Sequence, residues 1–151
     1  MLGNLTDRQI DYLLFSQVIG RIGCYADGDI FVVPVTYVFD GHYIYAHSKE
    51  GKKIDMMRVN GEVCFEVEAM DNLANWRCAI IWGTYEELQD QKLQREGLQI
   101  LQDRIGPLRT SETTYSQRPA TIPQIVEKEK KPIVYRIKVE KKTGRFEKSG
   151  N

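Results

Sequence analysis

Two adjacent lysines follow a histidine and a serine in the stretch Tyr43-Ile-Tyr-Ala-His-Ser-Lys-Glu-Gly-Lys-Lys-Ile-Asp-Met-Met-Arg-Val59. The pattern favours a short strand over 43–46, a polar turn over 47–51 and a helix from Lys52 onward. His47 and Ser48 offer side-chain donors, and Lys53 adds charge beside the free N–H groups of a helix start. Lysines in a first turn oppose the helix dipole, which a bound anion would compensate. The stretch predicts a phosphate site; the alternative is a solvated turn with its lysines in water.

The residues upstream predict the strands that position this turn. Asp40-Gly41 joins two β-rich runs, 29–39 and 43–46, as a hairpin turn does. Pro34 lies inside the first run and cannot donate a backbone hydrogen bond, so this strand must be open there, at an edge, a bulge or a ligand. An open strand beside a phosphate site suits a flat ring that carries a phosphate.

The order and spacing of these pieces resemble the pyridoxamine 5'-phosphate oxidase-like flavoproteins, which have the FMN-binding split barrel. Within them the chain is most similar to the nitroimidazole-resistance-related branch. The resemblance covers residues 5–90 well and the last strand more weakly. The matching motifs are Gly20-Arg21, Val33-Pro34-Val35, His47-Ser48 and Gly51-Lys52-Lys53.

This resemblance implies a mainly β fold, a six-stranded antiparallel split β-barrel with about three flanking α-helices, and FMN as cofactor. It places the flavin ring along the backbone of the second strand and the phosphate at the helix start. The cofactor-binding residues so implied are Val33, Pro34, Val35, Thr36, His47, Ser48, Lys52 and Lys53, with Trp82 at a dimer interface. Split-barrel flavoproteins pair with the ring between protomers, so a homodimer is expected. No metal site and no catalytic residue is assigned.

Two departures from the family limit the function that the resemblance implies. The residues from Arg145-Phe146-Glu147 to Asn151 lack the C-terminal Arg and His pair that grips the substrate of vitamin B6 oxidases. Lys52 stands where the family phosphate motif has arginine, and lysine lacks the bidentate fork of a guanidinium. The expected function is therefore an FMN-dependent oxidoreductase acting on nitroaromatic or quinone-like small molecules. The alternatives are a haem-binding split-barrel protein and a non-enzymatic flavin carrier.

Composition bounds the remaining possibilities. The 151 residues suit a single domain, 1–151, and equal numbers of basic and acidic residues, 21 each, argue against nucleic acid as a partner. Three cysteines at wide spacing fit neither a disulfide framework nor a zinc site, which favours free thiols in the cytoplasm. No run of 18 apolar residues is present, so no membrane partner is expected.

The other segments give a coarse element order. Thr6-Asp7-Arg8-Gln9 is a capping box that opens a short helix ending near Ser16. Strands are expected over 18–25, 30–39, 63–69, 76–85 and from Ile133, with a helix over 90–104 whose Gln-rich face is solvated. Asn60-Gly61 is expected to end the second helix in a left-handed conformation. Residues 106–131 have no clear period and three prolines, which predicts a long loop.

Overall fold

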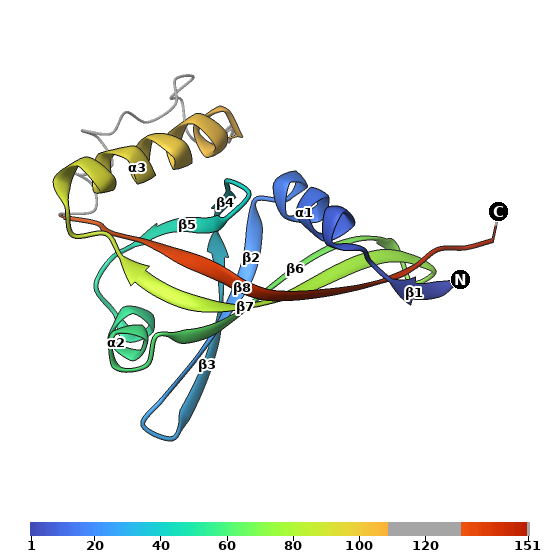
Figure 1. Ribbon diagram of the computed structural model, residues 1–151, viewed down its shortest axis with the longest axis horizontal. Helices are drawn as coiled ribbons and strands as arrows, with labels where there is room; N and C mark the ends of the chain where they lie inside the picture. Colours follow the sequence, from blue (N-terminus) through green and yellow to red (C-terminus); the bar gives the residue numbers. More distant parts are fainter. Residues whose placement is uncertain (109–130, 151) are drawn as a thin grey trace, which may run out of the picture.

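One antiparallel sheet organises the chain in a computed structural model that describes residues 1–108 and 131–150 (Figure 1). Within these residues the sheet has eight strands, six of them longer than three residues. The elements are β1 (Leu2–Asn4), α1 (Asp7–Ser16), β2 (Ile19–Ala26), β3 (Asp29–Thr36), β4 (Val38–Phe39), β5 (Tyr43–Ser48), α2 (Lys52–Val59), β6 (Glu62–Asn72), β7 (Asn75–Glu87), α3 (Gln91–Ile105), a 3-10 turn (Gly106–Leu108) and β8 (Ile133–Glu147). The mainly β split-barrel class with three helices is confirmed. The loop predicted over 106–131 lies mostly outside the described residues.

The strand order leaves the sheet open along one seam. The strands are hydrogen-bonded in the order β3-β2-β6-β7-β8-β5-β4, with β1 on β8, so β3 and β4 form opposite edges although they follow each other in sequence. The chain crosses between the two edges at Tyr37, which is fully buried and whose hydroxyl donates to the Leu14 carbonyl at 2.7 Å. The two edges therefore meet at Tyr37. Away from Tyr37, β3 pairs only with β2 and the last residues of β5 pair only with β8, so a seam without strand pairing separates β3 from β5.

The core fills the curled sheet and extends beneath the helices. Alternation in the strands follows the expected period of two, as in β2, where Ile22, Cys24 and Ala26 are buried and their neighbours are not. The capping box of α1 is present, because the Thr6 hydroxyl accepts from the Gln9 N–H and the Gln9 side chain accepts from the Thr6 N–H. α3 packs on the other side of β5 and β8 through a second cluster that contains Leu98, Leu101 and Val134. In Figure 1, α3 and α2 lie at the same end of the sheet.

Two boundaries differ from the sequence predictions. The strand expected over 30–39 is split at Tyr37, because burying that ring turns the chain from one sheet edge to the other. The left-handed end expected for α2 is wrong: Asn60 is extended, with φ −134° and ψ 109°. Its side chain bridges instead, donating to the Tyr25 carbonyl at 2.9 Å and accepting from the Glu62 N–H at 3.1 Å.

A β-bulge at Gly83 leaves no room for a side chain. The register of β7 and β8 shifts between Trp82 and Gly83, and a Cβ on Gly83 would lie 2.3 Å from the Lys138 carbonyl oxygen. Because that obstacle is backbone, we expect Gly83→Ala to lower the free energy of unfolding by about 2 kcal/mol in urea titrations. Gly61→Ala is the matched control, since its Cβ would meet nothing closer than 3.7 Å. Equal midpoints for the two variants would contradict the bulge geometry.

Candidate functional site

The edge of β3 at the seam offers unpaired backbone groups. The Tyr37 N–H donates to the Val18 carbonyl at 2.9 Å, and β2 and β3 pair antiparallel from there. Backbone groups alternate sides along such a pair, so Val35 and Val33 also bond to β2. The backbone groups of Pro34 and Thr36 point to the open edge. Thr36 offers an N–H donor there, whereas proline has no N–H. The proline therefore stands where the sequence predicted, at a strand edge that no neighbouring strand covers.

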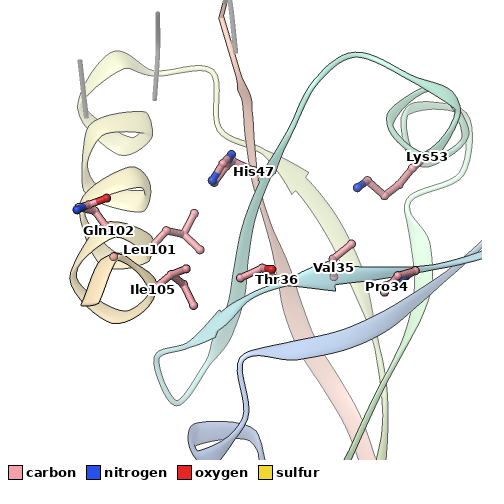
Figure 2. A pocket seen from close by; sticks show the side chains of 9 residues that line it. Pro34, Val35, Thr36, His47, Lys53, Leu101, Gln102 and Ile105 are labelled. Carbon is pink, nitrogen blue, oxygen red and sulfur yellow. The ribbon is translucent and has the colours of Figure 1, made fainter. Parts of the chain in front are cut away.

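A pocket of about 400 Å³ occupies the seam (Figure 2). We call it the seam pocket. It is lined by Pro34, Val35, Thr36, His47, Lys53, Leu101, Gln102, Ile105 and Gly106. Figure 2 shows Lys53 reaching in from α2 on one side, while Leu101 and Ile105 point in from α3 on the other, with His47 and the β3 residues between them. The pocket thus has a charged end at α2 and an apolar wall at α3.

Lys53 is the cation of this pocket. Its side chain is half-buried, and burial lowers the pKa of its ammonium group, with a smaller opposing influence from Cys24. Its Nζ lies 6.0 Å from the centroid of the Tyr135 ring, and no carboxylate among residues 1–108 and 131–150 pairs with it. A partly desolvated ammonium without a carboxylate partner is suited to an anionic ligand.

The first turn of α2 adds backbone donors beside Lys53. The residue before the helix is Gly51, which has no side chain to cap it, and no side-chain cap hydrogen bond is present. The first intrahelical bond runs from the Asp55 N–H to the Gly51 carbonyl at 3.0 Å, so the N–H groups of the preceding turn are available. Free N–H groups and the positive end of the helix dipole therefore lie in the same turn as Lys53, which lines the charged end of the pocket.

The structure brings five of the nine predicted cofactor-binding residues together: Pro34, Val35, Thr36, His47 and Lys53 line the seam pocket. The other four lie elsewhere. The Ser48 hydroxyl donates to the Lys49 carbonyl at 2.9 Å, and Lys52 pairs with Asp29 at 2.8 Å while its Nζ lies 4.7 Å from the Phe31 ring centroid. Val33 packs against the core, and Trp82 lies on the outer face of the sheet.

Sequence reasoning missed the α3 wall of the pocket. Leu101 and Ile105 lie on the apolar side of that helix, but an apolar pattern does not say which element it faces. Gln102 belongs to the Gln-rich face that was interpreted as solvated, yet it lines the pocket and is only partly exposed. No local signal connects these residues to His47, which lies more than 50 positions earlier.

A second hollow lies on the outer face of β2, β3, β6 and β7. This outer groove has a volume of about 610 Å³ and is lined mainly by apolar groups, including Gly23, Tyr25, Ile30, Val32, Cys64 and Trp82. Ile30 and Val32 are 73% and 60% exposed, which is unusual for neighbouring aliphatic side chains on one strand face. Both lie on the same exposed face of β3 as Pro34 and Thr36, which line the seam pocket further along the strand.

With this geometry described, comparison with known proteins decides the family. The sequence model of the pyridoxamine 5'-phosphate oxidase family matches residues 6–146. The chain belongs to this family. A curated relative, an uncharacterized protein of Rhizobium meliloti, is 33% identical over 70 residues, which span 46% of each chain.

Several solved structures share the fold. A FAD-binding protein of Mesorhizobium loti is 27% identical, with a TM-score of 0.73 over 97% of this chain and 98% of that one. A candidate 5-nitroimidazole antibiotic resistance protein of Bacteroides thetaiotaomicron is 20% identical, with a TM-score of 0.71 over 97% and 87% of the two chains. A FAD and haem binding protein of Mycobacterium smegmatis is 17% identical, with a TM-score of 0.72 over 98% and 74%.

Neither a metal cluster nor a membrane span is found in the part of the chain that the structure describes. No group of three or more His, Cys, Asp or Glu side chains there is arranged to hold a metal ion. None of the described helices is both long and apolar enough to cross a bilayer. Cys24, Cys64 and Cys78 are free thiols, and burial raises the pKa of each.

Proposed function

We propose that this chain binds FMN in the seam pocket and serves as an FMN-dependent oxidoreductase for nitroaromatic or quinone-like compounds. The observation that carries the proposal is the meeting of an unpaired β3 edge with a half-buried lysine at an uncapped helix start. Membership of the pyridoxamine 5'-phosphate oxidase family and the flavin-binding neighbours support it. A bound flavin supplies hydride and single-electron transfer, which no side chain here can provide.

Different residues of the pocket would bind different parts of the cofactor. Lys53 and the first N–H groups of α2 bind the phosphate, and the Thr36 N–H donates to the polar edge of the ring. Leu101 and Ile105 exclude water from the opposite side. Since Lys53 is the only pocket-lining cation among the described residues, and a lysine makes no bidentate pair, the phosphate is held less firmly than an arginine would hold it.

An absorption spectrum of the purified protein after incubation with FMN is the first test. Flavin bands that remain with the protein after gel filtration support the proposal, whereas a Soret band supports the haem-binding alternative. Turnover of a nitroaromatic acceptor with a nicotinamide donor then separates an oxidoreductase from a flavin carrier. A protein that retains no flavin would refute the proposed function.

We further propose that the protein is a cytoplasmic homodimer whose partner copy covers the outer groove. Pro34 and Thr36 of the seam pocket are exposed on the face of β3 that also carries the groove residues Ile30 and Val32, so a three-ring cofactor along this strand edge would remain exposed in one chain. A second copy on the groove would close this side. The mostly apolar lining of the groove favours an interface of identical chains, and two of the charged residues that also line it, Arg21 and Glu66, are paired with each other.

The lowered pKa of Lys53 predicts a pH dependence of FMN binding. Phosphate binding needs the protonated amine, which the free protein loses as pH rises through a pKa below the ordinary 10.5. We expect the affinity for FMN, but not for riboflavin, to fall as pH rises through that lowered value, in fluorescence titrations between pH 7 and 10. Lys53→Arg is the control, because a guanidinium stays charged throughout and should remove the dependence. Parallel curves for the two flavins would contradict the assignment.

A further inference from the structure

Arg58 lies at the end of α2 and makes four hydrogen bonds to two carboxylates. Its Nη1 and Nη2 donate to Glu50 at 2.8 and 3.0 Å, and its Nε and Nη2 donate to Glu87 at 2.7 and 3.1 Å. Both contacts are bidentate, which is the geometry that gives an arginine–carboxylate pair its directional strength. Tyr85 donates a further hydrogen bond to Glu87 at 2.8 Å.

These bonds connect the two ends of α2 to the sheet. Glu50 stands in the turn just before the helix, Arg58 in its last turn, and Glu87 at the end of β7. A second path leads back to the pocket, because the Tyr85 ring lies 5.3 Å from the Tyr135 ring and Lys53 Nζ lies 6.0 Å from the Tyr135 centroid. The turn that carries Lys53 is thus fixed from both sides.

The position of Glu50 gives its pairing with Arg58 a consequence for anion binding at the start of α2. Glu50 directly precedes Gly51, so its carboxylate is within reach of the uncapped N–H groups of α2. An acidic group is attracted to a helix start and would compete there with a bound phosphate. In the structure the Glu50 carboxylate is bonded by Arg58 at 2.8 and 3.0 Å, and no side-chain cap hydrogen bond is present at the start of α2.

We propose that Arg58 is a positioning residue of the phosphate end of the seam pocket: it keeps Glu50 off the start of α2 and holds the turn that presents Lys53. The inference rests on the proposed flavin function. It assigns Arg58 no contact with the cofactor. Its effect is therefore confined to ligands that carry a phosphate.

The test compares FMN with riboflavin, which has the same ring and no phosphate. In Arg58→Met we expect FMN affinity to fall about tenfold, while riboflavin affinity stays within about twofold of the wild type, as measured by fluorescence titration. Arg136→Met is the matched control: Arg136 also bonds a carboxylate of β7, Glu86 at 2.7 Å, and lies 4.0 Å from the Tyr43 ring centroid, but does not touch α2. Its preference for FMN over riboflavin should equal that of the wild type.

A second substitution tests the role assigned to Glu50. Adding Glu50→Gln to Arg58→Met removes the competing charge and should restore at least half of the lost FMN preference on a logarithmic scale. Arg58→Gln replaces Arg58→Met if the methionine variant does not fold by circular dichroism, with the same expectations.

The outcomes separate this inference from the proposed function. Equal losses for FMN and riboflavin would mean that Arg58 only supports the fold, and an unchanged FMN preference would mean that it does not position the site; either result overturns the inference alone. Failure of Glu50→Gln to restore the preference also overturns it. A wild-type protein that binds FMN no more tightly than riboflavin would refute the phosphate site itself, and the inference with it.

Discussion

Lys53→Glu lowers FMN affinity at least tenfold, a loss of about 1.4 kcal/mol, in a protein that remains folded. The substitution replaces the half-buried ammonium of the seam pocket with a carboxylate that repels the phosphate. It also puts an acidic group in the first turn of α2, where it occupies the N–H groups that an anion would use. Both changes act on the phosphate, so riboflavin affinity should stay within about twofold.

The neighbouring lysine provides the control. Lys52→Glu makes the same charge change one residue earlier, but Lys52 is exposed and paired with Asp29 at 2.8 Å outside the pocket. We expect it to reduce FMN affinity less than threefold, because solvent screens an exposed charge. Fluorescence titration of the two folded variants decides the matter. Unchanged FMN affinity in Lys53→Glu, or equal losses of FMN affinity in the two variants, would show that Lys53 does not bind the phosphate.

The contrast between Lys52 and Lys53 shows where sequence reasoning ends. The pattern placed both at the start of a helix, and α2 begins at Lys52 as expected. Adjacent helical residues point about 100° apart, so both cannot face one pocket. Only the packing of α2 against β2 and β8 decides that Lys53 turns inward while Lys52 turns to Asp29 and Phe31.

Features encoded by neighbouring residues were predicted more reliably than those encoded by distant ones. The capping box of α1, the bounds of α2 and the position of Pro34 at an open edge all follow from a few adjacent residues. The wall formed by Leu101, Gln102 and Ile105 depends instead on where α3 docks, which its own sequence does not determine. The extended Asn60 also reflects a distant partner, the Tyr25 carbonyl, which its side chain reaches.

The exposure of Trp82 on the sheet also depends on residues that are distant in sequence. A strand was expected over 76–85, and its residue Ile81 is fully buried, whereas the neighbouring Trp82 is 39% exposed in this chain. The bulge after Trp82 and the contact of its ring with Lys141, at 4.9 Å, keep it on the outer face. It lines the outer groove and not the seam pocket, so any contact with a flavin would have to involve a second copy.

The expected mass in solution is twice the 17.5 kDa chain, and Val32→Glu should reduce it to that of one chain. Val32 is 60% exposed on β3 and lines the outer groove, between Ile30 of the groove and Pro34 of the seam pocket. In a homodimer covering this groove, the new carboxylate would be buried where the basic groove residue, Arg21, is already paired with Glu66 and Glu68, which costs several kcal/mol. Such a dimer buries about 2,000 Å² or more in total, and light scattering at micromolar concentration measures its mass.

Loss of the proposed dimer should also reduce flavin binding, because the exposed β3 edge of the seam pocket would then lose the cover that a second copy would give it. Leu73→Glu is the matched control: Leu73 is 83% exposed in the turn between β6 and β7, outside the groove, so both the mass and the bound flavin should be unchanged. A wild-type mass of one chain with stoichiometric FMN would show that one protomer completes the site. A Val32→Glu protein that stays dimeric would place the interface on another face. If Val32→Glu is monomeric and loses flavin while Leu73→Glu does neither, the outer groove is the surface that connects assembly to cofactor binding.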